Sequence, residues 1–364
     1  MDLKAVRAGL PVLERLAYMN AGTNGPLPRR TAEAISRALE RDLLDGRSSE
    51  SYFESMLAGR DELRAALAGF LGTSPDRIAL ASSTTEGCNV VIAGLGIGPG
   101  DEAVTTDSEH SGLFGGLKAS GAELRVVELK DRPVEEALEA LEAAITKRTR
   151  LIALSHISWL TGAVFPVREL AGRGIPLLVD GAQSAGAIPV DVEELGCDFY
   201  TVSAQKWLLG PDVTGALYIA PERVEDLRMV FPSYGSWDWE AEAAYTPKTT
   251  AARFDPGWIP LGSVAGLLES LAFATEAGED RFDHARSMAR RLRELLADRY
   301  DLVTAPEQAT LVTWKAEEES ADVVARLAEA GVIVRDLPGL GWVRASCGFW
   351  TSDEDLERLV EALG

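Results

Sequence analysis

The feature that most constrains the fold is an alternation of short apolar, β-rich runs with helical patterns between about residues 60 and 220. Helical stretches such as EGCNVVIAGL and PVEEALEALEAAI separate the runs. Strands that alternate with helices form crossover units, so we predict an α/β fold with a mostly parallel, seven-stranded sheet between helices. Ligands bind such sheets beyond the carboxyl ends of the strands, which is where we expect the chemistry. The runs are IALA (78–81), EAVTT (102–106), AELRVVEL (122–129), RLIALSHIS (150–158), IPLLVD (175–180), CDFYTVS (197–203) and TGALYIA (214–220).

The pattern changes beyond residue 256. A long helical region (about 261–299) is followed by ATLVTWKA, ADVVARLAEAG, VIVRD, GWVRASC and DEDLERLVEALG, which predict a smaller α+β layer. A chain of 364 residues is long enough for a large and a small domain. We therefore expect an N-terminal segment (1–20) that packs with the small domain, a large domain (21–255) and a small domain (256–364).

Composition excludes several classes of function. The formal net charge of −21 repels phosphate backbones, so we expect no nucleic-acid partner. No stretch approaches the roughly 20 apolar residues that span a bilayer, and the first residues lack the apolar core of a signal peptide. We expect a cytoplasmic protein without membrane contact. The three cysteines and three histidines are scattered, which predicts no metal site.

Asp180 ends the apolar run IPLLVD. An aspartate after a strand is commonly only the N-cap of a helix. A carboxylate at the end of a fully apolar strand is costly, however, unless a positive partner compensates it. A protonated pyridine nitrogen would be such a partner.

Lys206 follows the run CDFYTVS in the segment SAQKWLLGP. Its neighbours Trp207, Leu208 and Leu209 are apolar, and an apolar setting lowers the pKa of an amine, as Schiff-base formation requires. The alternative is a surface lysine that buries only its aliphatic stem. The presence of Asp180 shifts the balance toward a covalent anchor for a cofactor.

Three further features could contribute to a site. Ser82 to Thr85 precede a helical pattern, and a helix N-terminus with hydroxyl groups is suited to phosphate, although ordinary capping is the alternative. His110 follows a strand at the predicted carboxyl edge. Arg344, in GWVRASC, could hold a substrate carboxylate as a bidentate fork. A lone histidine or a strand arginine is more often structural.

Taken together, these segments resemble the class V aminotransferase family of fold-type I enzymes, which depend on pyridoxal 5′-phosphate (PLP). That family includes cysteine desulfurases, selenocysteine lyases, C–S lyases and isopenicillin N epimerase-like proteins. The resemblance implies PLP as cofactor and a homodimer with active sites at its interface, which the aromatic stretch 231–258 would suit. It extends over YMNAGTNGPLP, SSTTEGCN, DSEHSG, LSHISWLTGAVFPV, LLVDGAQSAG, SAQKWLLGP and VRASCGFWTSDEDLERLV.

The resemblance also implies roles for single residues. Lys206 would hold PLP as a Schiff base and move the substrate Cα proton, while Asp180 would pair with the ring nitrogen. His110 would stack on the ring, and Gln183 would hydrogen-bond the phenolic oxygen. The remaining expectations are phosphate binding by Thr84, Thr85 and Ser203, cofactor binding by Gln205 and Trp258, and substrate binding by Arg344, Asn24 and Trp159.

Departures from the family pattern narrow the reaction. Desulfurases carry a nucleophilic cysteine shortly before the Arg-Ala-Ser strand, but the corresponding stretch RDLPGLGW (335–342) has none. Cys347 fits a packed core thiol better. Trp159 replaces an asparagine, Trp258 replaces a threonine that reaches the partner subunit's phosphate, and Gln205 replaces a common histidine.

The pattern looks closest to the C–S lyase branch. We expect β-elimination on a cysteine-derived substrate, such as cystine or a cysteine S-conjugate, to give pyruvate, ammonia and a sulfur product. An aminotransferase remains an alternative, with Arg253 or Arg335 as a second carboxylate site. An isopenicillin N epimerase-like enzyme is another, and a desulfurase or selenocysteine lyase is less favoured. A protein of this fold with only a regulatory or binding role is the alternative from outside enzymology.

Overall fold

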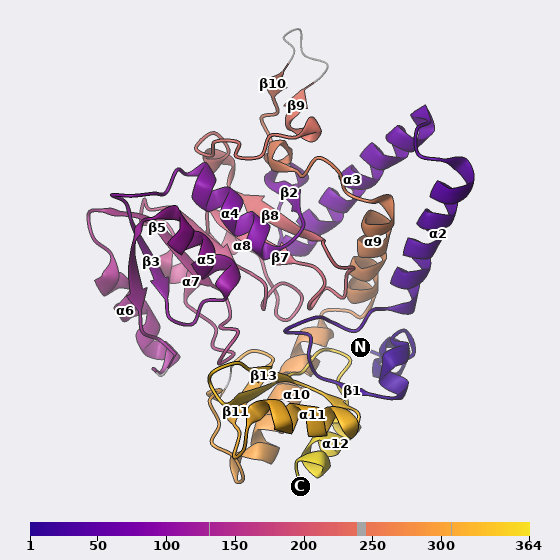
Figure 1. The fold of residues 1–364 in the computed structure, drawn as a ribbon, viewed down its shortest axis with the longest axis vertical. Helices are drawn as coiled ribbons and strands as arrows, with labels where there is room; N and C mark the ends of the chain where they lie inside the picture. The colour runs from indigo at the N-terminus through magenta and orange to yellow at the C-terminus, as the bar shows by residue number, and fades with distance from the viewer. Residues whose placement is uncertain (131, 239–244, 307) are drawn as a thin grey trace.

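The computed structural model describes residues 1–130, 132–238, 245–306 and 308–364. Its centre is a seven-stranded sheet with the order β2-β8-β7-β6-β5-β3-β4, in which only β8 runs antiparallel to its neighbours (Figure 1). This confirms the predicted mostly parallel sheet. The strands are β2 (Ile78–Ala81), β3 (Glu102–Thr106), β4 (Glu123–Val127), β5 (Thr149–Ser155), β6 (Leu177–Asp180), β7 (Phe199–Ser203) and β8 (Gly215–Ile219).

Apart from the edge strand β4, the strands of the sheet are largely buried on both faces, which explains why they are rich in apolar residues. Successive side chains of a strand point to opposite faces, so Leu178 and Val179 of β6 enter two different core clusters. The helices α4 (Thr84–Gly94) and α5 (Ser111–Ser120) cover the face of Leu178. The face of Val179 is covered by α3 (Glu50–Leu71), α6 (Ala137–Ala144), α7 (Val167–Leu170), α8 (Val192–Leu195) and α9 (Leu261–Glu276).

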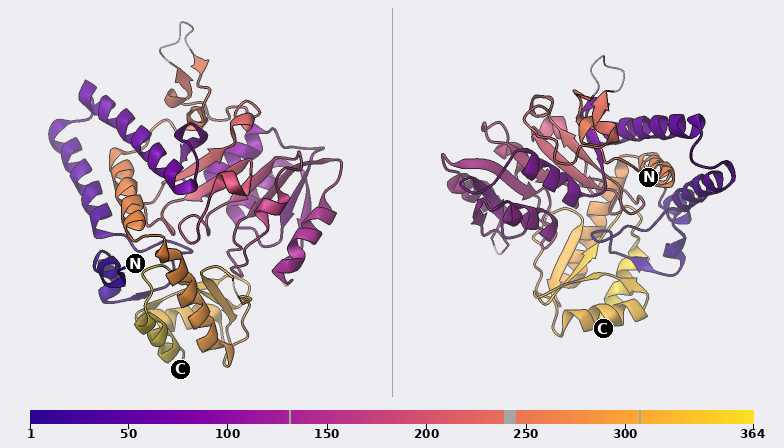
Figure 2. Two further views of the ribbon diagram at one scale, coloured as in Figure 1. Left: turned by 180° about the vertical axis from the view of Figure 1, so that it is seen from behind. Right: turned by 45° about the horizontal axis from the view of Figure 1, so that its top comes forward.

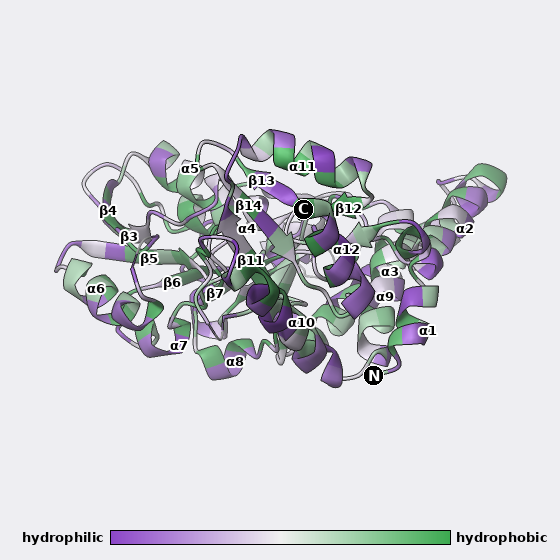
Figure 3. Ribbon diagram, turned by 90° about the horizontal axis from the view of Figure 1, so that it is seen from below, coloured by the Kyte–Doolittle hydropathy of each residue, from purple (hydrophilic) through white to green (hydrophobic). Residues whose placement is uncertain are grey.

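The second layer is a three-stranded antiparallel sheet with the order β11-β14-β13 (Figure 2). It packs with the helices α10, α11 and α12 around one core cluster. Figure 3 shows hydrophilic stretches, in purple, on α10 and α12. The N-terminal strand β1 (Ala17–Tyr18) pairs with β12 (Val332–Ile333) of this part. The remaining elements are β11 (Leu311–Lys315), β13 (Arg335–Leu337), β14 (Trp342–Ser346), α10 (Asp280–Ala297), α11 (Ser320–Glu329) and α12 (Asp353–Leu363).

The long helical region expected at 261–299 consists of two helices. Gly278, at φ +81°, separates α9 from α10, because a left-handed backbone ends a helix and suits glycine. Leu267 and Leu271 of α9 pack into the core of the large sheet, whereas Leu292 of α10 packs into the small one. The domain boundary at residue 256 stays a prediction. Helix α9 follows that boundary in the sequence, but its core contacts are with the large sheet.

The N-terminal half also contains a long helix pair, in which α2 (Arg29–Asp45) packs on α9 before the chain turns into α3. Helix α1 (Leu3–Ala8) precedes it, and a short hairpin, β9 (Trp237–Asp238) with β10 (Thr246–Pro247), lies in the aromatic stretch. The central residues of that stretch, 239–244, lie outside the described residues. No helix of the described ranges is long and apolar enough to cross a membrane.

Candidate active site

The predicted site residues gather at the carboxyl ends of β5, β6 and β7. Ser155, Asp180 and Ser203 are the last residues of these strands, and Lys206 lies in the turn directly after β7. Gly25 from the N-terminal segment donates its N–H to the Gln205 carbonyl at 2.8 Å. A Cβ at Gly25 would lie 2.2 Å from the Lys206 carbonyl oxygen, so only glycine allows this close approach.

Asp180 is a buried carboxylate without an ion-pair partner among the described residues. Its side chain is 3% exposed, and Oδ1 accepts the Ala182 N–H at 2.9 Å. Burial raises the pKa of Asp180, and the nearby Lys206 charge opposes that rise. A buried carboxylate of this kind is stabilised by a cationic ligand group.

Lys206 is partly buried at the same edge of the sheet. Desolvation lowers the pKa of its amine to about 8, with Arg344 contributing and Asp180 opposing. A lowered pKa leaves a useful fraction of the amine neutral near pH 7 to 8. The neutral amine is the form that attacks a carbonyl group and that accepts a proton.

Hydroxyl groups and a helix N-terminus lie beside this pair. Ser203 Oγ accepts the Thr84 N–H at 2.9 Å and donates to Thr84 Oγ1 at 3.2 Å, and both residues are buried. Thr84 and the exposed Thr85 form the first turn of α4. Gln205 has a buried Oε1 without a hydrogen-bond partner in the described part of the chain. This set of polar groups fits an anionic phosphate.

His110 is the N-cap of α5, and its Nδ1 accepts the Gly112 N–H at 3.1 Å. This bond leaves the proton of the neutral ring on Nε2. Desolvation, Lys206 and Arg344 lower the pKa of His110 to about 4, so the ring is neutral at physiological pH. The ring meets Trp159 edge to face, with centroids 5.3 Å apart.

Arg344 enters the site from β14 of the small domain. Its side chain is 1% exposed, and Nη1 donates to the Trp159 carbonyl at 2.7 Å. Nε has no hydrogen-bond partner, and no carboxylate of the described residues pairs with the guanidinium. Burial, followed by the charge of Arg335, lowers the pKa of Arg344 to about 10. A buried arginine without a protein counter-ion is suited to an incoming carboxylate.

Gln183 is held from two sides. Trp207 Nε1 donates to its Oε1 at 3.0 Å, and its own Nε2 donates to the Gly22 carbonyl at 2.9 Å. Both Gln183 and Trp207 are buried. The amide retains one N–H for a ligand, because Nε2 carries two hydrogens.

Two of the predicted residues, Trp258 and Asn24, are exposed in the single chain. Trp258 is 53% exposed and contacts Phe53 of α3 edge to face, so within one chain it is a surface residue. The Asn24 side chain is exposed, and its backbone carbonyl accepts the Tyr18 hydroxyl at 3.0 Å. The same N-terminal segment reaches the site through Gly22, where a Cβ would lie 2.6 Å from Arg344 Nη2.

Sequence reasoning missed Glu109. Its carboxylate accepts hydrogen bonds from Thr106 Oγ1 at 2.6 Å and from Ser155 N and Oγ at 2.9 and 2.6 Å. Burial raises the pKa of Glu109 to about 7, and the Asp180 charge contributes. The glutamate lies in the polar segment TTDSEHSG, directly before His110, so the local sequence does not indicate that its side chain is desolvated. Only the pairing of β3 with β5 and of β5 with β6 brings it near Asp180.

Arg253 and the cysteines have structural roles. Arg253 is buried and donates to Glu225 at 2.7 Å and to two backbone carbonyls, so it is not available to a second substrate carboxylate. Cys88, Cys197 and Cys347 are all free and buried, and burial raises their thiol pKa values. None of them is an exposed nucleophile.

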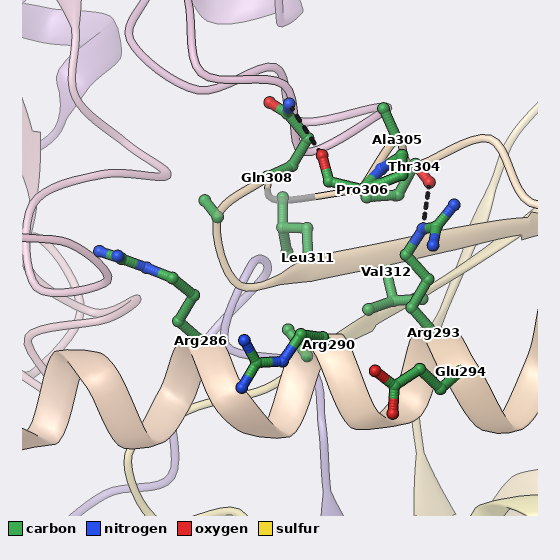
Figure 4. Close-up of a pocket in the computed structure, with 12 residues that line it drawn as sticks. Arg286, Arg290, Arg293, Glu294, Thr304, Ala305, Pro306, Gln308, Leu311 and Val312 are labelled. Atoms are coloured by element: carbon green, nitrogen blue, oxygen red, sulfur yellow. Dashed lines mark hydrogen bonds between the residues drawn. The ribbon is translucent and has the colours of Figure 1, made fainter.

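A separate cavity of about 120 Å³ lies between α10 and the segment that leads into β11 (Figure 4). Arg286, Arg290 and Arg293 line its helix side, and Arg293 Nε donates to the Thr304 carbonyl at 3.0 Å. No predicted site residue borders it. We therefore place the chemistry at the edge of the large sheet and not in this cavity.

A lysine after one strand and a buried aspartate at the end of the neighbouring strand, in a mostly parallel sheet with a small C-terminal domain, define a PLP-dependent enzyme of fold-type I. The unpaired Asp180, the amine of Lys206 and the hydroxyl-lined N-terminus of α4 offer partners for the ring nitrogen, the aldehyde and the phosphate of PLP. The chain belongs to the aminotransferase class-V family, whose model matches residues 18–359. The predicted fold, family and cofactor are thereby confirmed.

Its relatives are enzymes of several reactions. Isopenicillin N epimerase of Streptomyces clavuligerus is 30% identical over 100% of this chain and 98% of its own length. A probable cysteine desulfurase of Methanothermobacter thermautotrophicus is 28% identical over 100% and 98%. The cystine C–S lyase C-DES, solved in complex with its product cysteine persulfide, superposes with a TM-score of 0.92 at 28% identity over 97% of this chain and 98% of that one.

Proposed function

We propose that this chain is a C–S lyase that performs β-elimination on cystine or a cysteine S-conjugate. The products would be pyruvate, ammonia and a sulfur compound, which is cysteine persulfide when the substrate is cystine. PLP, when bound, withdraws electrons from the substrate Cα and so makes its proton acidic.

The observation that carries the proposal is Arg344, a buried guanidinium with no carboxylate partner among the described residues. Its position supports binding of a substrate α-carboxylate. Arg335 lies directly opposite on β13, with its side chain 43% exposed and its nearest acid, Asp336, at 3.9 Å. Two neighbouring cations suit a substrate with two carboxylates, and cystine has that structure.

Lys206 supplies the proton transfer in this proposal. Its neutral amine removes the proton from Cα, the Cβ–S bond breaks, and the electron pair of that bond leaves with the sulfur group. Water then hydrolyses the remaining unsaturated fragment to pyruvate and ammonia, so the overall reaction consumes one water and no oxidant. The lowered pKa of Lys206, about 8, suits a base that acts near neutral pH.

The cysteines support elimination over desulfuration. Desulfuration requires a thiolate that attacks the substrate sulfur, and a buried thiol with a raised pKa is poorly suited to that role. Cys347, the cysteine nearest in sequence to Arg344, is fully buried in the core of the small domain. The side chains beside Arg344 are aromatic: Trp159, whose carbonyl accepts from Arg344, contacts the ring of His110 edge to face.

An epimerase is the second candidate, since the relative with the highest identity given above is an isopenicillin N epimerase. Epimerisation needs a proton donor on the ring face opposite Lys206. His110 would lie on such a face, but with a pKa of about 4 its ring is neutral at pH 7 and lacks the extra proton that a donor would supply. Transamination would need a site for a second amino or keto acid, for which Arg335 is the remaining candidate.

We also propose that the enzyme works as a homodimer and that Trp258 acts across its interface. Trp258 and Phe53 form an exposed aromatic pair, and α2 and α3 carry further exposed leucines. An accumulation of exposed apolar side chains supports a protein–protein contact in this part of the molecule. Sedimentation equilibrium should give twice the chain mass, and a monomeric, fully active enzyme would contradict the proposal. The leucines are Leu39, Leu43, Leu44 and Leu57.

The decisive experiment uses purified, PLP-loaded enzyme with L-cystine, S-methylcysteine and L-cysteine, and separates pyruvate, alanine and D-amino acids among the products. Catalytic formation of pyruvate supports the lyase. Alanine would indicate desulfuration, and a changed stereocentre without release of sulfur would indicate epimerisation. Lys206→Ala should abolish elimination, and retained turnover would show that another group is the base.

A further inference from the structure

We propose that Trp207 is a positioning residue that fixes the side-chain amide of Gln183 so that an N–H, and not the oxygen, faces the bound cofactor. The proposal rests on the placement of Gln183 beside the phenolic oxygen of PLP. It does not depend on which reaction the enzyme performs.

The amide of Gln183 has two orientations of nearly equal shape, which its neighbours distinguish. In the observed one, Oε1 accepts the indole N–H of Trp207 at 3.0 Å, and Nε2 donates to the Gly22 carbonyl at 2.9 Å. A 180° rotation would set two donors against each other at Trp207 and two acceptors against each other at Gly22. Both contacts are buried, so water cannot replace the lost hydrogen bonds.

The indole N–H is the stronger constraint because Trp207 itself cannot move. Its side chain is 1% exposed and packs in one core cluster with Leu209 and Ala187. Gly186, at φ +95°, lies against its backbone, where an added Cβ would be 2.8 Å from the Trp207 carbonyl carbon. Trp207 also follows Lys206 directly, so the same turn presents the covalent anchor and the group that orients Gln183.

The hydrogen bonds from Trp207 through Gln183 and Gly22 continue to β14, the strand that carries Arg344. The Gly22 carbonyl accepts from Gln183, and the Gly22 N–H donates to Ser346 Oγ at 3.1 Å, two residues after Arg344 on β14. A Cβ on Gly22 would meet the Arg344 guanidinium. The relay Trp207–Gln183–Gly22 therefore connects the Lys206 turn with the N-terminal segment beside Arg344.

The expected consequence concerns the charge of the cofactor's phenolic oxygen. An N–H that points at this oxygen stabilises its anionic form, and an amide oxygen there repels it. Loss of the indole N–H leaves only Gly22 to hold the amide. The visible absorption band of the holoenzyme should then titrate about 0.5 to 1 pH unit higher, as loss of one hydrogen bond of ordinary strength would cause.

The test compares holoenzymes of Trp207→Phe, Gln183→Ala and the double variant, with Trp350→Phe as the matched control. Trp350 is equally buried, belongs to the same core cluster, and its Nε1 donates to the Tyr18 carbonyl at 3.0 Å, away from Gln183. The readouts are the pH midpoint of the visible band and the PLP dissociation constant of the reconstituted apoenzyme. W207F and Q183A should each raise the midpoint and weaken PLP binding, W350F should change neither, and the double variant should match Q183A.

Three results would overturn the proposal. An unchanged midpoint in W207F, with a shift in Q183A, would show that Trp207 does not orient the amide. A W207F shift that persists in the Q183A background would show that Trp207 acts by another route. An unchanged midpoint and an unchanged PLP dissociation constant in Q183A would show that Gln183 does not contact the cofactor, whichever products the enzyme forms. If W207F folds poorly, 3-benzothienylalanine at position 207 keeps the bicyclic ring without the N–H and should give the same shift.

Discussion

Arg335 and Arg344 lie directly opposite each other on the antiparallel strands β13 and β14. Like charges in such a pair are unfavourable, and here the buried member lacks a carboxylate partner among the described residues. The arrangement is reasonable for an enzyme whose ligand brings the negative charges. In the proposed complex with cystine, the buried Arg344 would bind the α-carboxylate and the partly exposed Arg335 the distal one.

This pair predicts different effects of two substitutions. Arg344→Gln should lower kcat/KM by about 100-fold or more for every amino-acid substrate, because it removes the bidentate contact to the α-carboxylate. Arg335→Gln should raise KM for cystine about 10-fold and leave S-methylcysteine within about 2-fold. Arg326→Gln, at an exposed ion pair of the same domain, is the control. Equal effects of Arg335→Gln on both substrates would contradict a distal-carboxylate role.

Asp180→Asn should have opposite effects on the apoenzyme and the holoenzyme. Burial raises the pKa of Asp180, and a raised carboxyl pKa means that ionisation near neutral pH costs stability in the cofactor-free fold. The amide removes that cost and keeps an acceptor for the Ala182 N–H, so the apoenzyme should melt a few degrees higher. Turnover and retention of PLP should fall, since the ring nitrogen loses its anionic partner. A lower melting temperature of apo Asp180→Asn would contradict this reasoning.

Glu109 predicts a pH dependence of stability. Its pKa is about 7 in the fold and about 4.3 in an unfolded chain, so the folded state binds this proton more tightly. Its contribution to the free energy of unfolding is therefore full below about pH 4 and falls by about 3–4 kcal/mol as the pH rises to about 7, since one pKa unit corresponds to about 1.4 kcal/mol. Denaturant titrations of apo wild type and Glu109→Gln should show this difference. Parallel curves for the two proteins from pH 4 to 8 would rule it out.

Gly22→Ala should damage substrate binding with little effect on folding. The added methyl group would lie 2.6 Å from Arg344 Nη2 and 3.0 Å from Ser346 Oγ, so it displaces the guanidinium. We expect kcat/KM to fall about 10- to 100-fold, mainly through KM, as misplacement of a binding group does. Gly69→Ala, on α3 with open space around the new methyl group, is the control and should retain wild-type kinetics. Unchanged kinetics in Gly22→Ala would show that Arg344 adjusts freely.

Much of the fold could be predicted from local patterns. Runs such as IPLLVD and CDFYTVS are rich in apolar residues because their strands are buried along their whole length, and this enrichment is visible without knowing their neighbours. Asp180 and Lys206 were predictable for a related reason, since strand ends in a parallel sheet meet at one edge. The break between α9 and α10 at Gly278 was missed, because a single glycine also occurs inside continuous helices.

The sequence alone thus determined which strands end in candidate site residues. It does so through the pattern of apolar residues along each strand and the order of the motifs. The surroundings of those residues depended on strand order and on contacts between distant segments. Glu109 follows β3 and Asp180 ends β6, and the two residues lie near each other because both strands pair with β5. Gln183 is oriented by Trp207 and Gly22, which come from two different segments. Trp258 illustrates the same limit, since folding one chain leaves it at the surface against Phe53. Hydrogen bonds and desolvation act over a few ångströms in space, and distance along the chain does not report that separation.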